Sequence, residues 1–198
     1  VLREAMQESG LEFTEEEGEA AFYGPKADFF ALDALGREWQ LSTIQVDLIQ
    51  PERLGCTYIG EDGAKHTPVV LHRAVTGTTE RFIGVLIEHF AGNFPAWLAP
   101  VQARLIPIAD RHFDYARSVA AQAKAAGLRV DVDEGGDRMQ AKIRTGQLQK
   151  IPYLLVVGDT EQEGESVAVR KRGGEDLGVQ SVEAFLTELG KEVEERRL

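Results

Sequence analysis

The sequence predicts an α+β protein whose first part is a portion of an antiparallel sheet with helices. The second part is predicted to be a three-layer α/β domain with a mixed sheet. Segments 27–33 and 38–48 are rich in aromatic and β-branched residues, and the Asp33-Ala-Leu-Gly36 segment between them is typical of a turn. Beyond residue 103, short apolar segments alternate with helical ones, which is the pattern of a sheet covered by helices.

A proline-containing segment, 93–100, separates these two patterns. Prolines interrupt both helices and strands, so such segments are typical of domain boundaries. We therefore expect one domain over residues 1–98 and a second over residues 99–198.

In the first part, a helix is expected over residues 1–9, and Gly10 stops it. An acidic turn follows it, and strands are then expected at 20–23, 27–33, 38–48 and 68–75. Residues 78–91 are predicted to form a helix with apolar side chains on more than one face, which indicates a buried helix.

The second part is expected to contain four strands and three helices. A helix over residues 113–126 is closed by Gly127. Two further helices are expected at 138–148 and 182–195, and strands at 103–109, 128–132, 153–157 and 166–171.

Composition narrows the functional class. The 198 residues are 43% hydrophobic, which allows real cores, and the single cysteine excludes an internal disulfide. The absence of a long apolar run predicts a soluble, cytoplasmic protein with no membrane partner. Val1 in place of methionine favours the interpretation that the sequence is a piece of a longer chain.

A net charge of −11 argues against broad nucleic-acid binding and against a DNA partner. A local basic face remains possible, because basic residues gather at Arg138, Lys142, Arg144, Lys150, Arg170, Lys171 and Arg172.

The segment from Val70 to Phe82 carries the strongest chemical signal. A strand ends in polar groups, and Gly77 opens a helix whose first N–H groups, together with Arg81, favour a bound anion such as a nucleotide phosphate. By the residues alone, a plain alternative stays open, in which His72 lies on the surface of the sheet and Arg81 at a solvated helix start.

The pattern Gly77-x-x-Glu80-Arg81 resembles motif 3 of the class II aminoacyl-tRNA synthetases. A histidine five residues before the glycine, His72 here, is similar to the threonyl-tRNA synthetases in particular. The resemblance implies that Arg81 contacts ATP, which is used with Mg²⁺, and that His72 is one ligand of a Zn²⁺ ion. The family's two other ligands, a cysteine and a histidine, lie upstream of this segment, so His66, His89, His112 and Cys56 are expected to be structural or surface residues.

Two upstream segments, Ala21-Phe-Tyr-Gly-Pro-Lys26 and Glu38-Trp-Gln-Leu-Ser-Thr-Ile-Gln-Val-Asp47, resemble the same family. The resemblance implies that Tyr23, Lys26 and Gln40 line a threonyl-adenylate pocket. Lys26, Gln40 and Arg81 are thereby the expected catalytic residues. Gln45, Asp47 and Thr78 complete the expected substrate and ATP site, although a packing role for Gln45 and Asp47 is as plausible.

The second part resembles the anticodon-binding domain shared by the threonyl, prolyl, histidyl and glycyl enzymes, through Asp137-Arg-Met-Gln-Ala-Lys-Ile-Arg144 and Lys150-Ile-Pro-Tyr-Leu-Leu-Val-Val-Gly-Asp159. It implies that Glu161, Arg170 and Arg144 contact the anticodon. Gly136 stands near the place where bacterial threonyl enzymes carry an asparagine, so one contact is in doubt. For Lys171 and Arg172, solvated charge and phosphate contact are equally plausible.

The resemblance implies a threonine–tRNA ligase that uses ATP, threonine and tRNA(Thr) and is a homodimer at full length. Without the upstream motifs and zinc ligands, the 198-residue chain alone is expected to be inactive. Two alternatives stay open: another class II synthetase, such as the prolyl enzyme, or a non-catalytic synthetase-like module that binds tRNA.

Overall fold

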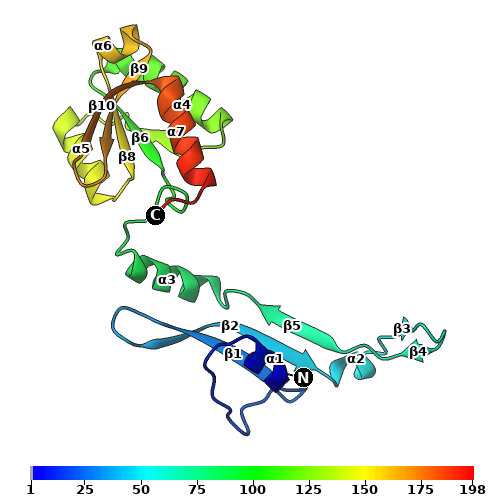
Figure 1. The fold of residues 1–198 in the computed structure, drawn as a ribbon. Coiled ribbons are helices and arrows are strands. Elements are labelled where there is room, and N and C mark those ends of the chain that lie inside the picture. Colours follow the sequence, from blue (N-terminus) through cyan, green and yellow to red (C-terminus); the bar gives the residue numbers. More distant parts are fainter. Residues whose placement is uncertain (1) are drawn as a thin grey trace. The chain divides into compact units, whose positions relative to one another are not determined.

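The computed structural model describes residues 2–198, and the chain divides into two compact units, Val1–His89 and Phe90–Leu198 (Figure 1). The division falls a few residues before the proline-containing segment 93–100. Each unit has its own sheets and is described separately below.

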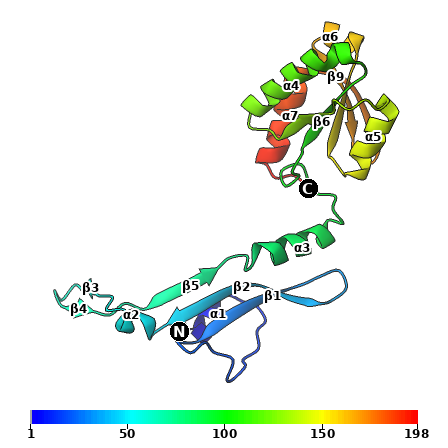
Figure 2. The same cartoon turned by 180° about the vertical axis from the view of Figure 1, so that it is seen from behind.

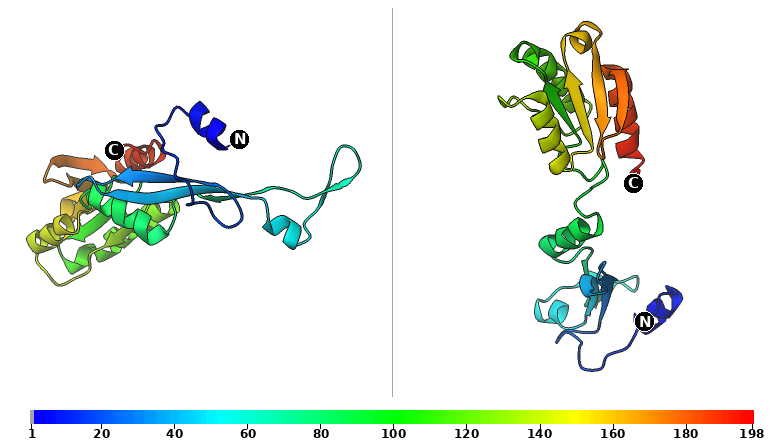
Figure 3. Two further views of the ribbon diagram at one scale, coloured as in Figure 1. Left: turned by 90° about the horizontal axis from the view of Figure 1, so that it is seen from below. Right: turned by 90° about the vertical axis from the view of Figure 1, so that its left-hand side faces the viewer.

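The first unit is built on a three-stranded antiparallel sheet in the order β1-β2-β5. These strands are Lys26–Leu32, Glu38–Asp47 and Val70–Ala74, and the remaining elements are α1 (Leu2–Glu8), α2 (Gln50–Arg53), the small β3–β4 hairpin (Tyr58–Ile59 and Lys65–His66) and α3 (Thr79–His89). A long loop connects α1 to β1 (Figure 3). The strand predicted at 20–23 was wrong, because only an isolated bridge joins Ala21 to Gly24.

A β-bulge interrupts the pairing of β1 with β2. Phe29 pairs with Ser42 but Phe30 pairs with Gln40, so Leu41 is an extra residue on β2. An extra residue shifts the alternation of side chains on one side of the bulge. Gln40 therefore lies on the same face as Gln45, although strict alternation along the strand would put them on opposite faces.

The prediction of a buried helix after Gly77 was also wrong. In α3 no residue is buried, and Ile83 and Ile87 are each 47% exposed. Among the described residues of this unit, only Asp47 and Pro51 are buried. Within the described residues of the first unit, the apolar side chains of α3 thus have no closed core to pack into.

The second unit is a five-stranded mixed sheet in the order β10-β9-β8-β6-β7. The strands are β6 (Ala103–Pro107), β7 (Val130–Val132), β8 (Tyr153–Val157), β9 (Ser166–Lys171) and β10 (Asp176–Ser181). The helices are η1 (Asp110–His112), α4 (Phe113–Ala125), α5 (Met139–Leu148), α6 (Asp159–Glu163) and α7 (Val182–Glu194). Strands β6, β7 and β8 are mutually parallel, and β9 and β10 are antiparallel additions.

Helices cover both faces of this sheet, with α5 on one side and α4 and α7 on the other (Figures 1 and 2). The larger core lies on the α4 and α7 side and includes Leu105, Leu155 and Phe185. The smaller core lies under α5 and includes Ile106 and Leu154. The expected three-layer α/β architecture with a mixed sheet is confirmed, and within residues 2–198 the buried hydrophobic side chains all belong to this unit.

Three basic side chains fix the chain before β6 to the second unit. Arg172 donates to the carbonyls of Phe94 at 2.7 Å, Lys150 at 3.0 Å and Asn93 at 3.1 Å. Arg129 donates to the carbonyls of Ala99 and Trp97 at 3.0 and 2.8 Å, and Lys150 donates to the carbonyl of Ala91. The segment 91–99 therefore belongs physically to the second unit.

These bonds change the interpretation of the basic residues. Arg172 contacts backbone carbonyls, so neither solvated charge nor phosphate contact describes it. Lys142 is buried and donates to the carbonyl of Asp133, and Arg170 pairs with Asp176. Four of the seven basic side chains noted in the sequence, Lys142, Lys150, Arg170 and Arg172, are thus bound to other groups of the fold.

Candidate functional site

A row of polar side chains crosses the sheet of the first unit. Lys26 of β1 pairs with Gln45 of β2, and Gln45 pairs with His72 of β5. Residues directly opposite each other in antiparallel strands point to the same face. Tyr23 joins this row: its hydroxyl donates to Oε1 of Gln45, and its ring centroid lies 5.6 Å from that of His72. Four of the expected site residues are thus brought together.

Asp47 is a buried carboxylate beside His72, the member of this row on β5. Its side chain is 1% exposed, and its Oδ2 is 2.9 Å from Nε2 of His72. Its Oδ1 accepts the backbone N–H groups of Ile49 and Gln50 at 3.1 and 2.9 Å. Burial works to raise the pKa of Asp47, but the bonds from His72, Gln50 and Ile49 outweigh it and hold that pKa below its ordinary value. Asp47 therefore stays an anion that fixes the His72 ring.

Lys26 faces a carboxylate that the sequence interpretation missed. Its Nζ lies 2.6 Å from Oδ2 of Asp28, and the two side chains are only 27% and 14% exposed. Burial works to raise the pKa of Asp28, but Lys26 and further hydrogen bonds, among them one from Gln40, leave it below its ordinary value. The spacing of two residues on one strand could have indicated this pair, since it puts both side chains on one face.

Gly77 brings the start of α3 against the bulge in β2. Its φ is +64°, and a Cβ at this position would lie 2.7 Å from the carbonyl oxygen of Leu41. Arg81, in the first turn of α3, donates from its Nη1 to the carbonyl of Gln40 at 2.9 Å. Thr78 precedes the helix, is exposed, and accepts the N–H of Phe82 through its carbonyl. The bulge thus places Gln40 and Arg81 side by side.

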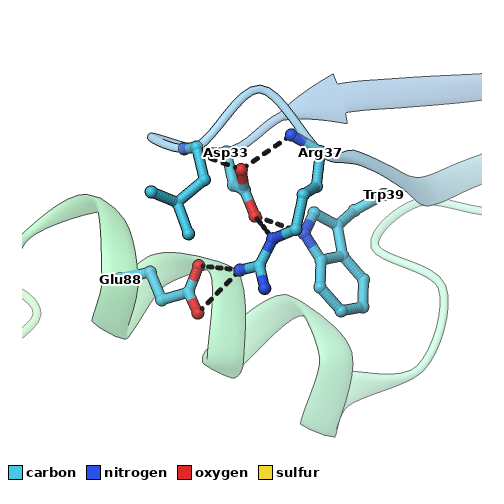
Figure 4. Close-up of polar contacts among 5 residues, drawn as sticks. Asp33, Arg37, Trp39 and Glu88 are labelled. Carbon is cyan, nitrogen blue, oxygen red and sulfur yellow. Dashed lines mark hydrogen bonds and ion pairs between the residues drawn. The ribbon is translucent and has the colours of Figure 1, made fainter.

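A second polar network holds the other end of α3 (Figure 4). Arg37 donates to both carboxylate oxygens of Glu88, at 3.1 and 2.9 Å, and also bonds Asp33 at 2.5 Å. The indole N–H of Trp39 donates to the same Asp33 carboxylate at 2.9 Å. The Trp39 bond, followed by those from Arg37 and Leu35, keeps the pKa of Asp33 well below its usual range. The β1–β2 turn is thereby tied to α3.

The described residues do not form a complete metal site. No group of three or more histidine, cysteine, aspartate or glutamate side chains that could hold a metal ion occurs in residues 2–198. His72 is one imidazole with a carboxylate behind it, which is the arrangement of a metal-binding histidine oriented by a second group. A catalytic zinc site needs three protein ligands.

The expected anticodon residues of the second unit do not converge on one point. Glu161 lies on α6, beside the start of β9, where Ser166 Oγ donates to its carbonyl at 3.3 Å. Arg170 lies four residues beyond Ser166 on β9, about 13 Å further along the strand. Arg170 pairs with Asp176 at 3.1 Å, and Arg144 is exposed on α5. These three side chains therefore belong to three different elements, α6, β9 and α5.

Comparison with known families divides the chain at nearly the same place. Residues 1–90 match the tRNA synthetase class II core domain (G, H, P, S and T), and residues 102–195 match an anticodon-binding domain. The fold and these matches define a class II aminoacyl-tRNA synthetase core portion joined to an anticodon-binding domain.

Individual relatives narrow this class. The chain is 60% identical over 197 residues to the threonine–tRNA ligase of Rubrobacter xylanophilus, covering 99% of this chain and 31% of that protein. It is 57% identical over 197 residues to a threonine–tRNA ligase of Thermus thermophilus, covering 100% of this chain and 30% of that protein. The chain belongs to the threonine–tRNA ligase family, and it spans about a third of the length of these relatives.

Solved structures give the same picture. The RNA-binding domain of threonyl-tRNA synthetase from Cryptosporidium parvum matches with a TM-score of 0.87 and 32% identity, over 96% of this chain and 48% of that one. A putative threonyl-tRNA synthetase from Aeropyrum pernix matches with a TM-score of 0.69 and 30% identity, over 98% of this chain and 48% of that one.

None of the helices within residues 2–198 is long and apolar enough to cross a membrane.

Proposed function

We propose that this chain is part of an enzyme that activates threonine with ATP and transfers it to tRNA(Thr). The observation that carries the proposal is the 60% identity to a threonine–tRNA ligase over nearly the whole chain. The polar row of the first unit supports it, because Lys26, Gln45 and His72 share one face.

In this proposal, Arg81, Gln40 and Lys26 act on the nucleotide and the reacting carboxylate. Adenylate formation develops negative charge on the phosphates, and positioned cations stabilise it. Arg81 supplies such a cation, and the Gln40 carbonyl aims its guanidinium. Lys26 supplies a second cation, and its ion pair with Asp28 holds it in place. Thr78 borders the same helix start, and Mg²⁺ would accompany ATP as part of the substrate.

Tyr23, Gln45 and Asp47 would form the threonine side of the pocket, with His72 as one ligand of a Zn²⁺ ion. The bond from Asp47 fixes the His72 ring and supports this assignment. Zinc bound to the amino and hydroxyl groups of threonine would discriminate against valine, which lacks the hydroxyl. Because the other ligands are not among the described residues, the isolated chain is expected to bind zinc weakly.

The second unit is proposed to bind the anticodon through Glu161, Arg170 and Arg144. A carboxylate accepts hydrogen bonds from base amino groups, and arginine offers a planar fork to base edges. The domain limits expected at 1–98 and 99–198 are moved in this proposal to between His89 and Phe90, because side chains of the second unit bind the backbone of segment 91–99. The complete protein is proposed to be a cytoplasmic homodimer.

The test is threonine-dependent exchange of pyrophosphate into ATP by the complete protein. We expect exchange with threonine and none by the 198-residue chain alone, which should still bind tRNA weakly through its second unit. Exchange with proline instead would assign the chain to another class II synthetase, and binding of tRNA without any exchange by the complete protein would assign it to a non-catalytic module.

A further inference from the structure

One polar cluster outside the candidate sites described above lies at the carboxyl ends of β6 and β8. Arg111 donates to both carboxylate oxygens of Asp159, from Nε at 2.9 Å and from Nη2 at 2.6 Å. Nε2 of His112 lies 2.9 Å from Oδ1 of the same carboxylate. The cluster joins η1, which follows β6, to the first residue of α6, which follows β8.

His112 is an unusual member of such a cluster because its side chain is only 1% exposed. Its Nδ1 accepts the backbone N–H of Ala109 at 3.2 Å. The ring hydrogen must therefore sit on Nε2, which donates to Asp159. These two bonds hold the imidazole in one orientation and one tautomer. Through Nε2, the ring in turn fixes the position of the Asp159 carboxylate.

The stability of helix α6 depends on polar contacts at its start. It is only five residues long and contributes no buried side chain. A single helical turn is unfavourable by itself, because nucleation fixes several residues for few hydrogen bonds. Polar contacts at its start hold it: Asp159 in the cluster, and Oε2 of Glu161, which accepts the N–H of Gly158 at 2.9 Å.

We propose that Arg111, His112 and Asp159 are positioning residues for recognition of the anticodon, since they hold the first turn of α6 and thereby aim Glu161 at a base. The inference rests on the proposed function of Glu161. Within residues 2–198, the hydrogen bonds of the Glu161 carboxylate involve Oε2, so Oε1 remains for an amino group of a base in a single-stranded loop.

The experiment measures equilibrium binding of the 198-residue chain to two RNA stem–loops, one with a threonine anticodon and one with a changed anticodon. The readout is the ratio of the two affinities. Glu161→Ala is expected to lower this ratio about tenfold, the loss typical of one base contact. Asp159→Asn and Arg111→Met are each expected to lower it by a similar factor, while binding of the changed RNA stays within about twofold.

A double variant separates positioning from general stability. If Asp159 acts through Glu161, Asp159→Asn combined with Glu161→Ala loses no more discrimination than Glu161→Ala alone. The matched control is Asp114→Asn, the same chemical change at a side chain that is 96% exposed on α4. It should leave the ratio unchanged.

Three results would overturn the inference in distinguishable ways. If Glu161→Ala abolishes discrimination but Asp159→Asn and Arg111→Met keep it, the positioning role is wrong and the proposed anticodon contact stands. If the unmodified chain does not discriminate between the two RNAs, both the contact and its positioning are wrong. Equal loss of binding to both RNAs by Asp159→Asn and Arg111→Met, with a lowered unfolding midpoint, would reduce the cluster to a structural role.

Discussion

The two units of this chain place their functional candidates by different physical means. The second unit surrounds its sheet with two apolar cores, and residues such as Leu105 and Leu155 are at most 1% exposed. The first unit holds Asp28, Asp33 and Asp47 in polar contacts while apolar side chains such as Leu71 stay 65% exposed. The difference teaches that the residues proposed to contact RNA stand on a unit with its own closed cores, whereas the catalytic candidates depend on hydrogen bonds across strands.

The largest expected effect tests this contrast directly. Leu155→Ala should cost about 2–5 kcal/mol in the free energy of unfolding of the second unit, because it opens a cavity in a closed core. Leu71→Ala in the first unit should change stability by no more than about 0.5 kcal/mol. Denaturant titration can follow each unit separately, because Trp39 and Trp97, the two tryptophans, lie in different units. Similar costs for the two variants would contradict the contrast.

The junction between Gly77 and the bulge is the next most sensitive feature. Gly77→Ala forces an L side chain into a positive φ and against the Leu41 carbonyl, so we expect a loss of about 1–3 kcal/mol in the first unit. Gly84→Ala, in α3 with nothing within 4 Å of the added Cβ, should instead stabilise the helix by about 0.5–1 kcal/mol. Trp39 fluorescence during unfolding measures both, and equal effects would rule out a special role of Gly77.

Release of the segment before β6 should have an effect of comparable size. Arg172→Met removes three hydrogen bonds from a cation to backbone carbonyls, and we expect a loss of about 1–3 kcal/mol together with faster proteolysis within 91–99. Lys171→Met changes an exposed neighbour and should alter neither quantity. Unchanged proteolysis in Arg172→Met would show that Arg129 and Lys150 hold the segment without it.

The smallest effect concerns pH. The pKa of Asp47 is lower in the folded protein than in the unfolded chain, so its contribution to stability is fully present above the ordinary aspartate pKa of about 3.9 and is lost as the pH falls through the folded value. We expect the first unit to lose stability in this acidic window, and Asp47→Asn to weaken that dependence. Unfolding monitored through Trp39 from pH about 5 downward measures it. An identical acid dependence in Asp47→Asn would assign the loss to other carboxylates.

Much of the second unit could be predicted from local sequence. Strands β8 and β9 begin and end at the expected residues, and α4 and α7 end one residue before the expected ends. The apolar residues of these elements are the ones that form the two cores, so the periodicity of the sequence agrees with the tertiary packing. Helix α6 and strand β10 were missed, because one is held by polar contacts and the other is largely exposed.

In the first unit, the motifs predicted which residues lie together more reliably than they predicted the burial of the neighbouring helix. Tyr23, Lys26, Gln45 and His72 do gather on one face, as the sequence indicates. The expectation for α3 failed because an apolar surface in sequence does not specify what covers it. Asp28 was missed because no motif marked it.

By itself, the sequence determined the two-part α+β organisation, the family and the set of candidate residues, because apolar periodicity and motif spacing are local properties of the chain. Only the tertiary structure decided that a bulge at Leu41 brings Gln40 to the face of Gln45 and beside Arg81. It alone also decided that Arg172 binds carbonyls and that His112 reaches Asp159. These contacts join residues far apart in sequence, and the pairing of strands that creates them depends on the whole fold.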